Sequence, residues 1–254
     1  MEWTDDAVVL GVKKHGETSV IAELMTRERG RHLGLVQGGR SRTLRPLLQP
    51  GNSVRAVWRA RLEDHLGQFK LESTGARAAK LMETPHGVYA LQTIAAHLRL
   101  LPERDAHPAL FAMLNIVLDN LTAPDIAGEL FVRFELAILD ELGFGLDLTQ
   151  CAATGRRRDL IYVSPKSGRA VNREAGAPYA ERMLPLPPFL LVANPLEVES
   201  ASLATIEDGF RLTGFFLDRH VFGPRAIDCP PERDGLIRAV RRAMEKEERE
   251  GPTL

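Results

Sequence analysis

The first 80 residues carry short runs of apolar side chains separated by turn-forming residues. The run from Val54 to Leu62 places two kinds of residue on opposite faces. One face has Val54, Ala56, Trp58, Ala60 and Leu62, and the other has Arg55, Arg59 and Arg61. This period of two is typical of a strand with one buried face. The runs cover residues 7–12, 19–25, 33–36 and 54–62 and a short stretch around Phe69 and Leu71. We therefore predict five strands.

These strands follow one another through glycine-containing turns, with no helical pattern between them. Several short strands with turns and no helix predict a small antiparallel barrel or sandwich. The five-stranded OB barrel is the smallest closed arrangement of this kind, and we expect it over residues 1–80.

Beyond residue 80 the apolar positions recur with the helical period. Thr84-Pro85 is typical of a helix start, and Gly143 is typical of a helix end. The predicted helices cover residues 88–98, 110–121, 130–142, 210–222 and 235–249. The expected fold class is therefore α+β, with a helical domain over residues 81–254 after the barrel.

An irregular insert, residues 148–195, interrupts the helical pattern and is rich in Gly, Pro and Arg. We expect one hairpin in it. Cys151-Ala-Ala-Thr154 has the spacing of half a zinc ribbon, with Thr154 in place of the second cysteine. Because one thiol cannot make a four-ligand site, we predict no metal and no other cofactor, and a buried Cys151.

Charge is strongly segregated along a chain whose 254 residues have a formal net charge of only −1. Residues 27–61 hold nine arginines against a single acid, whereas residues 81–150 hold three basic and ten acidic residues. The near-neutral total therefore does not exclude binding of a polyanion. The nine arginines are Arg27, Arg29, Arg31, Arg40, Arg42, Arg45, Arg55, Arg59 and Arg61.

We take these nine arginines as candidate contacts to a phosphate backbone, which guanidinium groups bind through bidentate hydrogen bonds and counterion release. OB barrels use one open face and its loops to bind single strands. Aromatic residues that could stack on bases are sparse in this segment. This favours contact with the phosphate backbone of a nucleic acid without recognition of its bases. The alternative is an arginine-rich strand that is simply solvated.

Two further basic features have open interpretations. Arg156-Arg157-Arg158, with Lys166, Arg169 and Arg173, is either a second polyanion contact or a solvated loop. Arg133 lies between Phe131 and Phe134 in an acidic segment. It is either a partner-binding residue for a carboxylate, together with these two rings, or an ordinary ion-pair partner of Glu129 or Glu135.

The search for catalytic and targeting motifs is negative. The sequence has no Walker A loop, G-x-S-x-G, H-E-x-x-H or G-x-G-x-x-G motif, and the seven histidines form no i,i+4 pair. No apolar stretch is long enough to span a membrane. The acidic start does not suit a signal peptide, and two cysteines cannot form a disulfide framework. We expect a cytoplasmic protein that is not an enzyme and has no membrane partner.

Three separated motifs resemble those of the RecO family of bacterial recombination mediators. The first is Val9–Glu17, and the second runs from Gly38-Gly39-Arg40-Ser41-Arg42 to Leu47-Leu48-Gln49-Pro50-Gly51. The third runs from Phe134-Glu135-Leu136 through Leu142-Gly143-Phe144-Gly145 to Cys151-Ala152-Ala153-Thr154-Gly155. The similarity extends over essentially the whole chain.

The resemblance implies an OB domain that binds single- and double-stranded DNA and a helical domain that docks partners. Members help anneal complementary strands coated with single-strand-binding protein and, with RecR and in some pathways RecF, help load RecA onto gapped DNA. The expected location is the cytoplasm, in association with the nucleoid. Arg40, Arg42 and Arg45, with the strand arginines, would contact DNA. Arg133 falls where some relatives contact the acidic tail of the single-strand-binding protein.

One departure from the family concerns zinc. Members with zinc carry two C-x-x-C pairs, and the corresponding positions here are Cys151, Thr154, Asn172 and Ala175. The insert is therefore expected to be a degenerate, zinc-finger-like segment held by packing and hydrogen bonds.

Three rival functions stay open from the residues alone. They are an OB-type RNA-binding or ribosome-associated factor, an interaction scaffold with an inert barrel, and an unrecognised nuclease or other enzyme.

Overall fold

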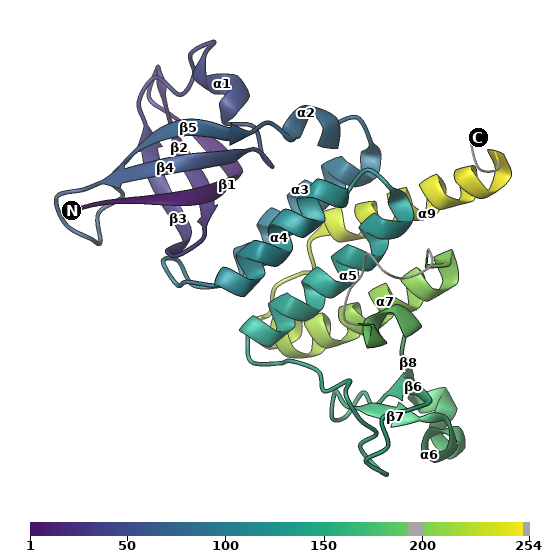
Figure 1. The fold of residues 1–254 in the computed structure, drawn as a ribbon. Coiled ribbons are helices and arrows are strands. Elements are labelled where there is room, and N and C mark those ends of the chain that lie inside the picture. The colour runs from purple at the N-terminus through teal and green to yellow at the C-terminus, as the bar shows by residue number, and fades with distance from the viewer. Residues whose placement is uncertain (193–200, 251–254) are drawn as a thin grey trace. The chain divides into compact units, whose positions relative to one another are not determined.

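The computed structural model describes residues 1–192 and 201–250 (Figure 1). A strand-rich N-terminal part is followed by helices, which confirms the α+β class. The chain forms two compact units, Met1–Thr122 (unit 1) and Ala123–Leu254 (unit 2). Residue 80 marks the change from strands to helices, and unit 1 also takes in the first helices. None of the described helices has the length and apolar character needed to cross a membrane.

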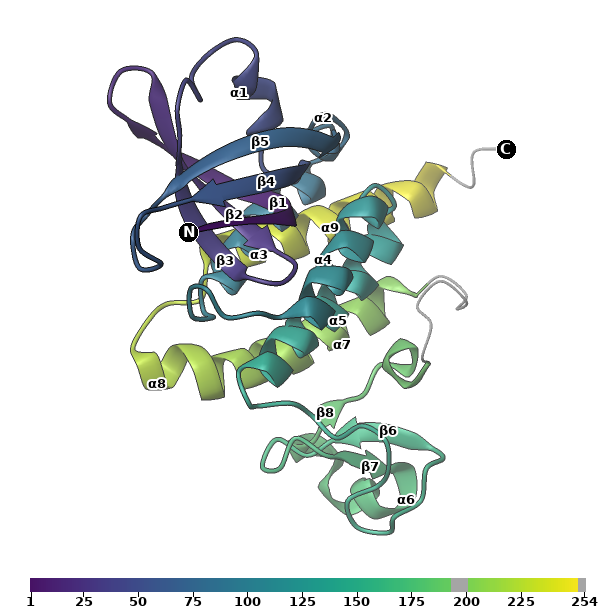
Figure 2. The ribbon, with the colours of Figure 1, turned by 60° about the vertical axis from the view of Figure 1, so that its left-hand side comes forward.

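Unit 1 begins with a closed five-stranded barrel in the order β1-β2-β3-β5-β4. The strands are β1 (Glu2–His15), β2 (Ser19–Thr26), β3 (Gly30–Val36), β4 (Ser53–Arg59) and β5 (Gln68–Gly75). Figure 2 shows β4 between β1 and β5. The expectation of a fully antiparallel barrel is wrong at one place, because β3 and β5 run parallel and share only the pair Leu35–Gln68. An odd number of strands in a ring cannot alternate direction everywhere.

The alternation predicted for β4 is confirmed. Val54, Ala56 and Trp58 are buried in the barrel core, and the arginines between them point outward. The strand ends at Arg59, so the predicted inward position of Leu62 is wrong, and this side chain is exposed in the loop that follows. β1 is longer than predicted because its polar first residues pair with β4.

His32 lies inside one end of the barrel, among Trp3, Trp58 and Phe69. Its residue exposure is only 3%, and neither ring nitrogen has a hydrogen-bond partner among the described residues. Burial, with the nearby charges of Arg104 and Arg29, lowers the pKa of His32 to about 4. The imidazole is therefore neutral in the folded protein at pH 7.

The helices of unit 1 are α1 (Leu44–Leu47), α2 (Ala78–Leu81), α3 (Pro85–Leu98) and α4 (Pro108–Asn120). Thr84 caps α3 by accepting a hydrogen bond from the Gly87 amide, as its sequence predicts. The link from α3 to α4 packs on the barrel at Gly30, which has a positive φ of 63°. A Cβ there would lie 1.7 Å from the Asp105 carbonyl oxygen, so only glycine fits.

Unit 2 packs α5, α7 and α9 around one apolar core. Its helices and turns are α5 (Pro124–Glu141), α6 (Arg173–Gly176), η1 (Ala177–Arg182), η2 (Pro188–Leu191), α7 (Leu203–Leu217), η4 (Asp218–Phe222), α8 (Gly223–Arg225) and α9 (Pro231–Glu250). The helix predicted from Phe210 begins earlier, because Ser202 caps α7 by accepting from the Thr205 amide.

The insert, whose residues 193–195 lie outside the described part, contains more regular structure than the single hairpin expected. β6 (Leu160–Val163) lies between β7 (Ala170–Asn172) and β8 (Leu184–Pro185). Cys151 is buried as predicted, and its sulfur accepts from the Asn172 amide at 3.3 Å. Asn172 also donates to Thr154 Oγ1 at 3.4 Å and caps α6 by accepting from the Ala175 amide. Nothing in the described residues supports the zinc-finger-like description, since no three potential metal ligands gather there.

These contacts also set the thiol chemistry of Cys151. Burial raises the pKa of the thiol, but hydrogen bonds from Thr154, Asn172 and Ala153 outweigh it and lower the pKa to about 7. Hydrogen bonds thus join all four of the positions that correspond to zinc ligands in the family, with Asn172 at their centre.

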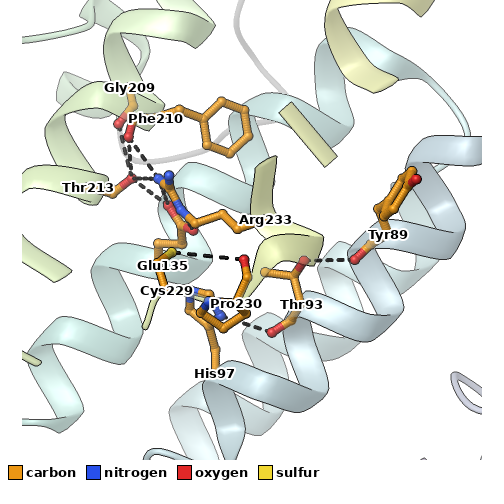
Figure 3. A network of polar contacts seen from close by, with 10 residues as sticks. All are labelled: Tyr89, Thr93, His97, Glu135, Gly209, Phe210, Thr213, Cys229, Pro230 and Arg233. Atoms are coloured by element: carbon orange, nitrogen blue, oxygen red, sulfur yellow. Dashed lines mark hydrogen bonds and ion pairs between the residues drawn. The ribbon is translucent and has the colours of Figure 1, made fainter. Parts of the chain in front are cut away.

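A buried ion pair joins α5 and α9 inside unit 2 (Figure 3). Arg233 Nε donates to Glu135 Oε1 at 2.7 Å, and its Nη2 donates to Glu135 Oε2 at 2.9 Å. The same Nη2 reaches the Phe210 carbonyl, and Thr213 donates to Glu135. Both charged side chains are almost fully buried, at 7% and 0% exposure. The partner of Glu135 is therefore Arg233, not the neighbouring Arg133 considered from the sequence.

We predict that protonation of His32 destabilises unit 1 in mild acid. The pKa of His32 is about 4 in the folded chain, against 6.5 for an ordinary histidine, so the unfolded chain binds more protons between these values. The free energy of unfolding should fall as pH decreases through this window, by up to about 3 kcal/mol. Urea unfolding of wild type and of His32→Phe at a series of pH values from 7.5 to 4 measures the free energy of unfolding of each protein. Equal pH dependence of the two proteins would contradict it.

We predict that Glu135→Ala or Arg233→Ala lowers the free energy of unfolding by about 3–5 kcal/mol, because each leaves a buried charge unpaired. The double variant Glu135→Leu/Arg233→Met should lose less than either single variant. Urea titrations followed by circular dichroism provide the measurement. Single variants within about 1 kcal/mol of wild type would show that the pair is not a structural requirement.

Candidate nucleic-acid interface

The outward arginines of β4 are paired with carboxylates from β1. In the strand register Arg55 lies opposite Asp6, and Arg59 lies opposite Glu2. Both guanidinium groups contact these carboxylates at 2.8 Å. Asp6 is also 3.3 Å from Arg27. The face is therefore partly neutralised by acids that precede the arginine-rich segment in sequence.

Arg31 does not belong to an exposed cationic surface. Its side chain is only 13% exposed and contacts Glu23 at 3.1 Å and Glu103 at 3.4 Å. Glu23 in turn binds Arg99 at 2.6 Å. This network connects the barrel to the α3–α4 link. Its residues are far apart in sequence, so a local sequence pattern could not predict it.

The remaining five arginines are exposed, and none has a carboxylate partner in the described part of the chain. They are Arg29, Arg40, Arg42, Arg45 and Arg61. Three of them belong to the segment between β3 and β4, residues 37–49, which we call the arginine loop. Arg40 fixes this loop to the β1–β2 turn, since its amide donates to the Thr18 carbonyl and its guanidinium donates to the Glu17 carbonyl at 2.6 Å.

Grooves lie on both sides of the arginine loop. One, of about 300 Å³, is lined by Lys14, Arg40 and Arg45 together with apolar residues. The other, of about 440 Å³, follows the β3–β5 seam and includes Gln37, Arg59 and Lys70. It shares Arg59 and Gln68 with a neighbouring hollow that contains Arg61 and His65. Of the nine predicted DNA-contacting arginines, Arg40, Arg45, Arg59 and Arg61 line these grooves. Lys14 and Lys70 also line them, and both lie outside the arginine-rich pattern in the sequence.

Two of the three partner-binding residues predicted in unit 2 are not on its surface. Phe131 and Phe134 are fully buried in the core, which is where their helical spacing with other apolar residues would place them. Their predicted role as surface contacts therefore does not fit this structure. Arg133 contacts Glu129 at 3.0 Å and donates to the carbonyls of Phe189 and Val192, so its guanidinium closes a local turn.

Three of the six arginines in the described part of the insert have carboxylate partners. Arg156 contacts Glu174 at 2.9 Å, and Arg173 contacts Asp159 at 3.3 Å. Arg157 and Arg158 are exposed. Because the ion pairs reduce the local charge, this surface is less cationic than its sequence indicates.

Comparison with known proteins gives matches along most of the chain. Residues 1–75 match the family model for the N-terminal part of recombination protein O, and residues 85–226 match the one for its C-terminal part. A DNA repair protein RecO of Rhizobium etli is 62% identical over 96% of this chain and 94% of its own length. The RecO protein of Agrobacterium fabrum is 59% identical over 97% of this chain and 96% of its own.

Proposed function

The chain belongs to the RecO family of DNA repair proteins, and from this membership we propose that it is a non-catalytic mediator of DNA repair and recombination. It binds single- and double-stranded DNA and promotes annealing of complementary strands. With RecR, and with RecF in some pathways, it helps load RecA onto strands coated with single-strand-binding protein. Family membership supports the repair role, and the cationic barrel surface supports the DNA contact.

The observation that carries this proposal is the arginine loop. Arg42 and Arg45 are exposed without carboxylate partners in the described residues, and Arg45 lines the groove that contains Lys14. Exposed guanidinium groups without a carboxylate partner can bind phosphates directly, and this binding releases counterions from the nucleic acid. We infer that the barrel is an OB fold, because five strands close with a short helix between β3 and β4.

The β4 arginines contribute less in this proposal. Arg55 and Arg59 already have counter-charges in Asp6 and Glu2. A phosphate that binds either guanidinium would replace a carboxylate of the protein, so few counterions would be released. Asp6 is shared between Arg27 and Arg55, so this cluster keeps a net positive charge that favours approach of the strand.

Annealing follows from the same electrostatics. Two strands held on one cationic surface repel each other less than they do in solution, because arginines neutralise part of their phosphate charge. Docking of the acidic tail of the single-strand-binding protein on unit 2 would deliver the chain to coated strands. Action in the cytoplasm, at the nucleoid, is part of this proposal.

We predict that the loop and strand arginines differ in the salt dependence of binding. Arg42→Gln/Arg45→Gln should weaken binding of a single-stranded oligonucleotide and lower the log–log salt slope by about 1.4. Arg55→Gln/Arg59→Gln removes the same charge but should leave the slope almost unchanged. Fluorescence anisotropy from 50 to 300 mM salt tests both. Equal slopes for the two variants would contradict the assignment to the loop.

We predict that wild type accelerates annealing of complementary strands coated with the cognate single-strand-binding protein, and that Arg40→Glu/Arg42→Glu/Arg45→Glu does not. Labelled strands and gel electrophoresis follow the reaction, with magnesium present. Shortening of the DNA would indicate a nuclease, and stronger binding of matched RNA would favour an RNA-binding factor. Either result would contradict the proposed function.

We propose that Arg133 binds the tail carboxylate of the single-strand-binding protein, and that this carboxylate takes the place of Glu129 as the partner of the guanidinium. Glu129→Gln should then tighten binding of a peptide with the tail sequence, because it removes the competing carboxylate, and Arg133→Gln should weaken it. Calorimetry measures both affinities. If Arg133 serves only the local turn, the variants change thermal stability while the affinity stays that of wild type.

A further inference from the structure

The seam between β3 and β5 leaves one edge of β5 open. The two strands share only the pair Leu35–Gln68, formed by the Leu35 amide and the Gly67 carbonyl at 3.0 Å. Backbone groups of alternate residues point to the same side of a strand. Gly67 and Phe69 flank the bridged Gln68 and face β3, so the backbone groups of Leu71 and Ser73 face the same side, where β5 has no further strand partner among the described residues.

A groove of about 440 Å³ is lined by residues 68–71 of β5, next to this edge, and also by Val57 and Arg59 of β4. Val36, Leu44 and Leu71 give it an apolar floor. The groove and the hollow that continues it contain the cations Arg59, Arg61 and Lys70, and no carboxylate is among the residues that line them. Arg61 and Lys70 have no ion-pair partner in the described part of the chain. An open strand edge, an apolar floor and a positive rim therefore occur together.

We propose that this seam binds an extended acidic peptide of a partner protein, which adds a strand to β5. A peptide strand offers both amides and carbonyls, so it can satisfy the donors and the acceptors of the β5 edge. A DNA backbone offers only acceptors to this edge, and its phosphates would face the β5 carbonyls. The backbone chemistry therefore favours a peptide.

The dimensions and charges define this peptide further. The edge from Phe69 to Ser73 is about 17 Å long, which matches a strand of about five residues. Apolar side chains at alternate positions would contact the floor, and acidic side chains between them would meet Lys70 and Arg61. This site shares Gln37 and Leu44 with the arginine loop but none of its arginines, so it does not depend on their proposed DNA contact, and it is separate from Arg133.

A synthetic peptide Asp-Val-Glu-Val-Asp-Val-Glu with blocked ends is the probe. We expect it to bind the full chain and to protect the amides of Leu71 and Ser73 from hydrogen exchange. The same peptide with N-methyl groups on alternate amides keeps its charges but loses its strand hydrogen bonds, and it should bind at least about tenfold more weakly. This comparison needs no protein variant.

Protein variants distinguish the contribution of the β5 backbone edge to peptide binding from that of the cationic side chains. Ser73→Pro removes an amide on the open side of β5, where proline is tolerated, and should weaken binding about tenfold, whereas Ser73→Ala should not. Arg61→Gln/Lys70→Gln should weaken binding most at low salt, and Arg133→Gln should have no effect.

The proposal would be overturned by equal affinity of the methylated and unmethylated peptides, or by absence of peptide binding. It would also be overturned if a single-stranded oligonucleotide, and not the peptide, protected the Leu71 and Ser73 amides. Loss of DNA binding in the arginine-loop variant with unchanged peptide binding would support two separate sites.

Discussion

Closing five strands into a ring forces one neighbouring pair to run parallel, and much of unit 1 follows from that constraint. The parallel pair, β3 and β5, meets at a single position, so the ring has a weak seam. The chain leaving β3 must also pass over the barrel end before it re-enters as β4. The arginine loop is this crossing. It lies outside the ladders, beyond reach of the acidic residues that β1 places opposite β4.

The same residue type therefore has three different roles within a few strands. Arg31 is enclosed by two carboxylates and holds the α3–α4 link against the barrel. Arg55 lies on the open face but is neutralised by its cross-strand neighbour. Arg42 is exposed with no such neighbour in the described residues. A charged surface that binds a polyanion is thus defined by the carboxylates around each arginine, and the number of arginines alone is a poor guide.

Local periodicity explains what the sequence could predict. The inward positions of β4 and the buried stripe of α5 follow from periods of 2 and 3.6, which depend only on neighbours in the chain. The parallel seam, the Glu2–Arg59 pair and the Arg31–Glu103 contact depend on residues far apart in sequence, and no local pattern contains them. Phe131 and Phe134 are a different case. Their helical spacing already indicates core positions, and that spacing is a better guide to their burial than their place beside Arg133.

The insert of unit 2 shows how a fold can persist when its chemistry changes. In family members with zinc, four thiolates are joined by one ion, whereas here Cys151, Thr154 and Asn172 are joined by hydrogen bonds of 3.3 and 3.4 Å. Bonds of this length are individually weak and could not replace a metal by themselves. Val163 and Ala170 are fully buried between the strands, so apolar packing supplies the remaining stability. Asn172 then has a specific task, because it joins the loop of Cys151 to the start of α6 and so fixes the register of a small sheet that lacks a large core.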